Sequence, residues 1–318
     1  MLLEILKLIL GLFLAIKGAD ILISSSVGLG LKLKVSDFFV GLVIVGFGTS
    51  IPELLVSIEA VLSNSANLSV GNILGSNIAN ILLVFSTLGF VNNIKIKSIA
   101  SFDIFFHLSM HIIFFLIFNF STFGKKFGML FIVFFLIYII FSLKFSKDKK
   151  QINTTNEMDY FSNFTFRKPF LFSLPILMIS ISLTLFGVDL AVNSAVHISK
   201  ELKIPDSFIG LSLIAIGTSL PELVTSISAA KRGNNQMIFG NIIGSNIYNL
   251  LFILGLSSLF KFFGYNYYIL KNDVLILTII IFIFSICLLK KITINKKISI
   301  IFLVSYILYL ITLYYRNF

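Results

Sequence analysis

Residues 48–58 read GTSIPELLVSI and residues 71–82 read GNILGSNIANIL. Both segments return 169 residues later, as GTSLPELVTSI at 217–227 and GNIIGSNIYNLL at 240–251. The same register extends outward without a gap to residue 18, and 28 of the 65 residue pairs so formed are identical. Chance composition does not produce such a match, so the chain contains an internal repeat of two similar halves.

The composition predicts that both halves lie in a membrane. Of the 318 residues, 57% are hydrophobic and 12% are charged, and the mean hydropathy is +1.01. Soluble domains carry about 25% charged residues, so this chain has too few charges to cover a soluble surface. A soluble enzyme and a disordered scaffold are excluded, and an integral membrane protein with many spanning segments is predicted. The net charge of +11 is assigned to cytoplasmic loops rather than to a nucleic-acid partner.

Ten apolar runs are long enough to span a bilayer as helices, since a hydrocarbon core about 30 Å thick needs roughly 20 helical residues. These runs are 3–28, 38–62, 69–90, 100–119, 127–145, 170–198, 207–230, 237–260, 273–290 and 298–315. Continuous apolar runs favour helices over the alternating strands of a closed barrel. The sequence therefore predicts an all-α polytopic membrane protein of ten transmembrane helices, five in each half. Because five is odd, the second repeat enters the membrane inverted.

The predicted domain organisation is a first repeat at 1–145, a polar linker at 146–168 and a second repeat at 169–318. Lysine and arginine residues in the loops and at the ends of the spans number 16 on the side that holds the linker and 7 on the other side. Positive charge favours the cytoplasmic side. We therefore expect a cytoplasmic linker and two external termini, in the cell membrane.

Each repeat carries one glutamate deep in a predicted span, Glu53 or Glu222, directly after a proline. A carboxylate at that depth costs roughly 2.5–3.5 kcal/mol on insertion scales, and the matching segments hold no lysine or arginine. The proline also frees a backbone carbonyl one turn earlier, which needs a partner inside a bilayer. A bound cation would satisfy both groups. Two protonated, packed glutamates are the competing interpretation, but they do not explain why the carboxylates recur at symmetric positions in a polar motif.

Hydroxyl and amide side chains are predicted to surround the two glutamates. Those within one turn of a glutamate are Thr49, Ser50, Thr218 and Ser219. Those spaced four apart on the following helices are Asn72, Ser76, Asn80, Asn241, Ser245 and Asn249. The same segments contain GxxxG, at Gly71 and Gly75 and at Gly240 and Gly244, which predicts close helix packing. Carboxylate, hydroxyl, amide and carbonyl oxygens suit calcium, magnesium, manganese or sodium, and a flexible ligand set with two negative charges favours calcium.

Some ionisable residues give a weaker signal. His107 and His111 lie four apart, a spacing that can bind a metal, but no carboxylate completes a metalloprotease pattern, so ordinary packing or snorkelling is expected. For Asp20, Asp189 and Glu59, an accessory or entry-path role and a structural role remain equally open.

The motif GTSxPE followed by GNxxGSNxxN, present in two inverted halves, resembles the cation/calcium exchanger superfamily, and most closely its prokaryotic sodium/calcium antiporters. The resemblance covers essentially the whole chain. It implies that Glu53 and Glu222 bind calcium and sodium, and that Thr49 and Thr218 complete the calcium site through backbone oxygens. It also implies an inner sodium site, an outer sodium site and a central amide pair. The residues concerned are Ser50, Ser76 and the Gly46 carbonyl (inner), Ser219, Ser245 and the Ala215 carbonyl (outer), and Asn80 with Asn249 (central).

The activity implied by the resemblance is secondary antiport of calcium against sodium by alternating access, with no cofactor. A calcium/proton antiporter of the same superfamily is the main alternative. A cation channel is less well supported, because channels usually assemble symmetric rings from several chains. An intramembrane enzyme would need a nucleophile–base pair or a metal–histidine site, and the sequence offers neither. Some relatives, including potassium-dependent ones, carry aspartate where this chain has Asn249, and the smaller negative charge of this site is a weak argument against potassium cotransport. The oligomeric state stays open.

Overall fold

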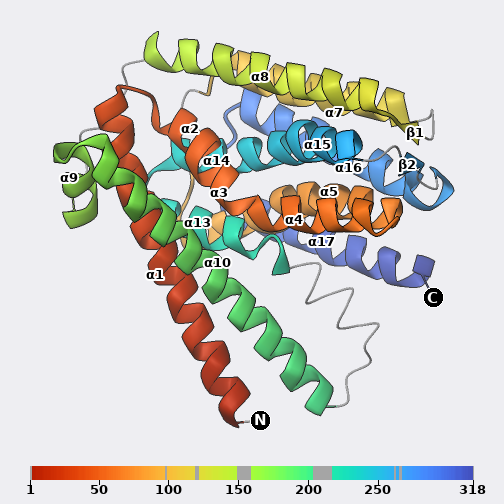
Figure 1. Ribbon diagram of the computed structural model, residues 1–318, viewed down its shortest axis with the longest axis horizontal. Coiled ribbons are helices and arrows are strands. Elements are labelled where there is room, and N and C mark those ends of the chain that lie inside the picture. The colour runs from red at the N-terminus through yellow and green to blue at the C-terminus, as the bar shows by residue number, and fades with distance from the viewer. Residues whose placement is uncertain are drawn as a thin grey trace.

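The structure is a computed structural model that describes residues 2–96, 99–118, 122–148, 159–202, 217–260, 263–264 and 267–317. Within these ranges the chain is almost entirely helical, as the sequence predicts (Figure 1). The extended segments described are β1 (Thr122–Phe123) paired antiparallel with β2 (Phe263–Gly264), and an isolated bridge between Ile94 and Ile294.

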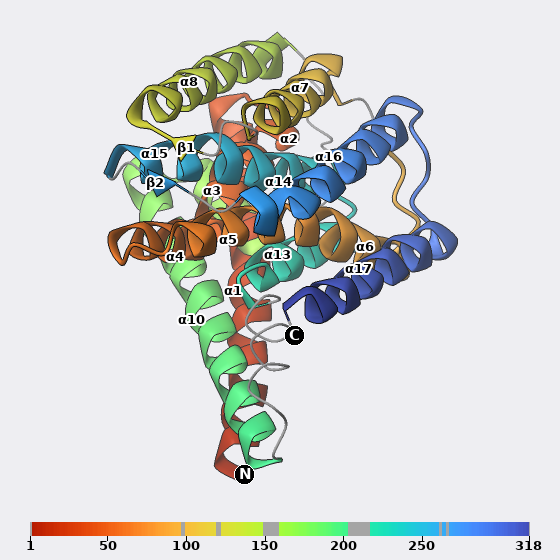
Figure 2. The same cartoon turned by 90° about the vertical axis from the view of Figure 1, so that its right-hand side faces the viewer.

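Two 32-residue helices, α1 (Leu2–Leu33) and α10 (Phe170–Glu201), lie side by side and extend away from the other helices (Figures 1 and 2). Glycines on α1 let the two backbones meet. A Cβ atom on Gly11 would lie 2.6 Å from the backbone nitrogen of Ala191, and one on Gly18 would lie 2.6 Å from that of Thr184. Along this contact the residue numbers of α10 fall as those of α1 rise, so the two helices are antiparallel.

The linker contributes a short helix, α9 (Tyr160–Arg167), that packs on α1. Asp159 caps its N-terminus by accepting a hydrogen bond from the Ser162 backbone N–H at 3.0 Å, and it pairs with Arg232 at 2.6 Å. Burial raises the pKa of Asp159, but hydrogen bonds from Ser24, Ser162 and Arg232 outweigh it and hold the pKa at about 2. The described part of the linker is therefore helical and docked.

Helix breaks divide the segments that carry the GTSxPE motif. In the first half, α2 (Asp37–Val40), the π-helical η1 (Gly41–Val45) and α3 (Gly46–Thr49) lead into α4 (Ile51–Leu62) with a bend of 47°. Pro52 lies in the first turn of α4, where its missing N–H leaves the turn before it without a helical hydrogen bond. In the second half, α13 (Leu220–Lys231) begins in the same way: φ and ψ are −84° and 7° at Ser50, and −91° and 1° at Ser219.

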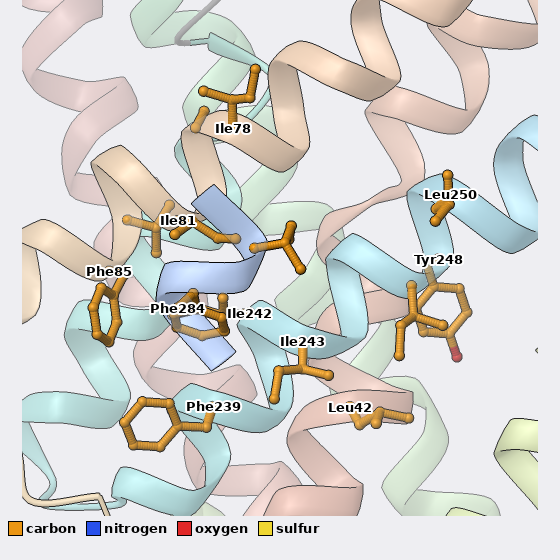
Figure 3. Packing of buried hydrophobic residues seen from close by; sticks show 14 of the residues in the cluster. Leu42, Ile78, Ile81, Phe85, Phe239, Ile242, Ile243, Tyr248, Leu250 and Phe284 are labelled. Atoms are coloured by element: carbon orange, nitrogen blue, oxygen red, sulfur yellow. The ribbon is translucent and has the colours of Figure 1, made fainter. Parts of the chain in front are cut away.

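Two interrupted helices form the centre of the molecule. The first is α5 (Ala66–Ala79), η2 (Asn80–Val84) and α6 (Phe85–Val91); the second is α14 (Asn235–Ile247), η4 (Tyr248–Ile253) and α15 (Leu254–Phe260). In the most apolar 18-residue stretch of each, 78% and 83% of the residues are buried. Figure 3 shows Ile81 and Phe85 of the first close to Ile242 of the second, and the ring centroid of Phe85 lies 6.4 Å from that of Phe239. Each π-helical turn begins two or three residues after a GSN motif, and such turns occur frequently at functional sites.

Four outer helices complete the described structure: α7 (Ser101–Phe118), α8 (Lys125–Asp148), α16 (Tyr267–Leu289) and α17 (Lys296–Asn317). Among the described residues, seven helices are long and apolar enough to cross a membrane, or eight if the bent pair α2–α4 is one span. The sequence predicts ten spans. Helix α1 is outside this set, and the predicted span 207–230 is described only from residue 217.

Candidate cation site

Two buried carboxylates form the centre of the candidate site. Glu53 lies in the first turn of α4 and Glu222 in the first turn of α13, and both are 0% exposed. Each follows a helix break, so it lies at a helix N-terminus, where free N–H groups favour negative charge. The two carboxylates are close enough to repel each other. None of the ion pairs in the described part of the chain includes either of them.

Hydroxyl groups from both halves contact Glu222. Ser50 Oγ donates to Glu222 Oε1 at 3.3 Å, and Ser245 Oγ donates to the same oxygen at 3.4 Å. Ser245 Oγ also lies 3.5 Å from the Gly46 carbonyl. The resemblance puts Ser50 and Gly46 in the inner sodium site and Ser245 in the outer one, whereas Ser50 and Ser245 contact the same carboxylate and Gly46 is joined to it through Ser245. Through Ser50, the helix break of the first half therefore contacts the Glu222 carboxylate of the second half.

Two asparagines of the GN motif support the helices behind the carboxylates. Asn72 Nδ2 donates to the Glu53 carbonyl at 3.2 Å and to Ser57 Oγ at 2.9 Å. Asn241 Nδ2 donates to the Glu222 carbonyl at 3.4 Å and to Ser226 Oγ at 3.0 Å. These equivalent contacts tie each central helix to the helix that carries a glutamate, and so fix the carboxylate positions.

Seven buried oxygen atoms of the repeated motifs have no hydrogen-bond partner in the described part of the chain. They are Glu53 Oε1 and Oε2, Glu222 Oε2, Ser76 Oγ, Ser219 Oγ, Asn80 Oδ1 and Asn249 Oδ1. Leaving one such group unsatisfied costs about 1–3 kcal/mol, so several together need an occupant that bonds to oxygen atoms, such as water or a cation. No cluster of three His, Cys, Asp or Glu side chains occurs among the described residues. Beyond the two carboxylates, the available ligands are neutral oxygens, which suit a hard cation.

The central amides are linked through two asparagines that the sequence analysis did not single out. Asn80 Nδ2 donates to Asn246 Oδ1 at 3.0 Å, and Asn249 Nδ2 donates to Asn77 Oδ1 at 3.0 Å. Each bond crosses from one half to the other. Asn77 and Asn246 are the asparagines of GSN, identical at the repeat spacing of 169, and that identity is the signal that could have found them.

The remaining predicted site residues differ in how they are placed. The Thr49 hydroxyl donates to the carbonyl of Val45, the last residue of η1, at 3.0 Å, and Thr218 is half-buried. Ala215 lies outside the described residues. Of the weaker candidates, Glu59 and Asp189 are exposed.

Asp20 joins α1 to the end of α13. Ser228 Oγ donates to Asp20 Oδ1 at 2.5 Å, and Arg232 Nη2 donates to the Asp20 carbonyl at 3.2 Å. These contacts give Asp20 a structural partner in the second half.

Close packing is confirmed for one of the two GxxxG pairs. A Cβ atom on Gly244 would lie 2.7 Å from the Leu42 carbonyl oxygen, and one on Gly240 would contact the Phe38 carbonyl oxygen, so α14 packs directly on α2 and η1. Gly71 and Gly75 have no comparable backbone neighbour among the described residues.

Comparisons with known proteins point to one family and one fold. The family model described as "Sodium/calcium exchanger protein" matches residues 3–144 and 172–315. The chain is 33% identical over 347 aligned positions to the sodium/calcium exchanger MaX1 of Methanosarcina acetivorans, covering 98% of both chains. It is 30% identical to the inner membrane protein YrbG of Escherichia coli, covering 81% of this chain and 80% of that protein.

Solved structures of the sodium-calcium exchanger NCX_Mj share the fold. The structure soaked with zero Na⁺ and Ca²⁺ has a TM-score of 0.83 at 29% identity, covering 98% of this chain and 99% of the other. The structure soaked with 2.5 mM Na⁺ and 1 mM Sr²⁺ has a TM-score of 0.81 at 30% identity, covering 97% of both. The resemblance drawn from the repeated motifs is confirmed, and the chain belongs to the sodium/calcium exchanger protein family.

Proposed function

We propose that the protein is a secondary antiporter that exchanges calcium for sodium across the membrane by alternating access. The observation that carries the proposal is the buried Glu53–Glu222 pair, which has three unpartnered carboxylate oxygens and no cationic side chain bonded to it in the described residues. Family membership and the likeness to MaX1 and NCX_Mj, which are named as exchangers of these ions, support the choice of ions.

The proposed ligands are two charged carboxylates and a set of neutral oxygens. Glu53 and Glu222 bind either ion, and backbone oxygens of Thr49 and Thr218 complete the calcium site. The sodium positions use Ser50, Ser76 and the Gly46 carbonyl on one side and Ser219, Ser245 and the Ala215 carbonyl on the other, with Asn80 and Asn249 between them. Two carboxylates neutralise one calcium ion, whereas a single sodium ion leaves a negative charge. Several sodium ions must therefore replace one calcium.

The proposed architecture is ten helices in two inverted repeats, at 1–145 and 169–318, joined by the linker at 146–168. The two ranges matched by the family model support this division. The antiparallel α1 and α10 support the inversion, and the matching backbone angles at the two helix breaks support the repeat. Further support comes from the bridge between Ile94 and Ile294 and its counterpart β1–β2, since each joins the loop after a central helix to the outer-helix loop of the other half.

The proposed orientation places the linker in the cytoplasm and both termini outside the cell membrane. A membrane-impermeant thiol reagent tests it in a Cys287→Ser background, which removes the single native cysteine. Reagent added outside intact cells should label Arg316→Cys and leave Thr155→Cys unlabelled. The reverse pattern would invert the topology.

Sodium-driven calcium flux tests the proposed exchange against its alternatives. The purified protein is reconstituted in liposomes loaded with sodium or with choline, and calcium-45 uptake is followed with and without a pH gradient. We expect uptake that requires internal sodium. Uptake that follows the proton gradient and ignores sodium would establish the calcium/proton alternative, and passive flux that requires neither gradient would indicate a channel.

A further inference from the structure

Two histidines on α7 lie directly behind the central amides. His107 and His111 are buried, at 0% and 1% exposed, and their ring centroids are 4.6 Å apart. They do not snorkel to a surface. His107 Nε2 lies 3.4 Å from Asn246 Nδ2, and His111 Nε2 lies 3.3 Å from Asn77 Nδ2.

Hydrogen-bond chemistry fixes the direction of the chain that starts at His107. An amide NH₂ group can only donate, so His107 Nε2 must accept from Asn246, which requires a neutral imidazole with its proton on Nδ1. The carbonyl end of Asn246 then faces Asn80 and accepts from Asn80 Nδ2 at 3.0 Å. With its NH₂ group held in this way, Asn80 keeps Oδ1 free of protein partners in the described structure.

We infer that His107 is a positioning residue for cation binding. By accepting from Asn246, it sets the orientation of that amide, and Asn246 in turn holds Asn80 with its oxygen, rather than its NH₂ group, available to a cation. An NH₂ group turned into the site would place two N–H donors where a cation needs an oxygen ligand. This inference rests on the proposed function of the Glu53–Glu222 site.

His111 also accepts a hydrogen bond from an asparagine amide, but the orientation of that amide depends less on the histidine. Asn77 Nδ2 donates to His111 Nε2 and also to the Asn246 backbone carbonyl at 3.3 Å. A backbone carbonyl only accepts, so Asn77 keeps its orientation when the imidazole is removed. The contacts described for Asn246 Nδ2 include no such second acceptor. His111 is therefore a matched control on the same helix, one turn away and equally buried.

Packing alone does not account for an imidazole at position 107. Nδ1 of His107 has no hydrogen-bond partner in the described part of the chain, and it is buried. An apolar side chain would fill the space beside Phe284, whose ring centroid lies 6.1 Å away, without burying that polar atom. The corresponding helix of the second half, α16, has no histidine in its sequence.

The test measures calcium affinity by titration of the purified protein without sodium, together with its unfolding temperature. Loss of the direct outer partner of a metal ligand typically lowers affinity 10- to 100-fold, and His107 acts one hydrogen bond further out, through Asn246, so we expect an effect near the lower end of this range. We expect His107→Leu to raise the calcium Kd about 10-fold or more, and His111→Leu to raise it less than about 3-fold. His107→Gln, whose Oε1 can take the place of the Nε2 acceptor, should restore the Kd to within about 3-fold of the wild-type value. His107→Phe replaces His107→Leu if the latter does not fold.

Three results would overturn the inference: a wild-type Kd in His107→Leu, equal losses in His107→Leu and His111→Leu, or no rescue by His107→Gln. Equal losses accompanied by lowered unfolding temperatures would assign both residues to packing. Sodium-driven uptake by the wild-type protein is measured in parallel. A wild-type protein that binds calcium without exchanging it contradicts the proposed function alone, because the His107 variants still report on the binding site. Absence of calcium binding by the wild type overturns both.

Discussion

Neutralising one of the two carboxylates should abolish calcium exchange without unfolding the protein. In Glu222→Gln the amide keeps the shape of the side chain, and its oxygen can still accept from Ser50 and Ser245, which lie 3.3 and 3.4 Å from Glu222 Oε1. The new NH₂ group takes the place of Oε2, which has no partner among the described residues. Repulsion with Glu53 also disappears, so the unfolding temperature in the absence of cations should not fall.

The loss of calcium affinity can be bounded from Coulomb's law. A calcium ion lies about 2.4 Å from a ligand oxygen. Even with the dielectric constant of bulk water, about 80, one carboxylate then attracts the ion by about 3.5 kcal/mol, which is a factor of about 300 in affinity. A buried site screens less than water, so about 300-fold is the smaller end of the expected loss.

Calcium titration and sodium-driven calcium-45 uptake measure this effect in Glu222→Gln and in the equivalent Glu53→Gln. The matched control is Glu59→Gln, because Glu59 is a carboxylate on the same helix as Glu53 but is exposed. We expect the control to bind and transport like the wild type. Robust exchange in either site variant, or a calcium Kd within about 10-fold of wild type, would refute the assignment of the two glutamates as shared ligands.

Further predictions concern the hydroxyls, the central packing and the linker. Ser50→Ala and Ser219→Ala should weaken the sodium dependence of exchange more than calcium binding, because they remove proposed sodium ligands and leave both carboxylates; a larger loss for calcium would contradict this. Gly244→Leu should prevent recovery of folded protein, since even a Cβ atom would lie 2.7 Å from the Leu42 carbonyl oxygen; normal recovery and thermal unfolding would show that α14 can shift. Asp159→Ala should cost about 1 kcal/mol through loss of the helix cap. Because the pKa of Asp159 is lowered from 3.8 to about 2, its contribution is complete above pH about 4 and is lost only as the pH falls toward 2. The destabilisation by Asp159→Ala should thus be equal at pH 5 and pH 8, and a difference between them would contradict the contacts described for this carboxylate.

The repeated motifs were sufficient to predict the helical fold and some of the residues that meet at its centre, but not Asn77 and Asn246, which link the central amides. Proline before each glutamate predicted the loosened turns that the structure has at Ser50 and Ser219. The two glutamates have no basic residue in their predicted spans, which predicted buried oxygens that need a cation. The cost of burying a charge depends on residue type and depth, so it can be judged from the sequence. The same reasoning predicted that both halves contribute, as the contact between Ser50 and Glu222 illustrates.

Contacts between distant segments were not predictable in this way. The four-residue spacing of His107 and His111 predicted only ordinary packing or snorkelling, since nothing local shows which amides face them. Docking of α9 on α1 depends on the fit of Thr165 against the Ser25 carbonyl, 3.1 Å away, 140 residues apart in sequence. The π-helical turns at Asn80 and Tyr248 likewise lie within continuously helical patterns, where periodicity does not mark them.

Competition between the two ions tests the shared site most directly. Calcium binding to the purified protein is measured at increasing sodium concentrations, with choline replacing sodium to keep the ionic strength constant. If Glu53 and Glu222 bind both ions in turn, sodium must displace calcium completely, with a Hill coefficient above one, since more than one sodium ion is needed to satisfy two carboxylates. Calcium binding that is unchanged by sodium, or lowered equally by choline, would contradict a shared site.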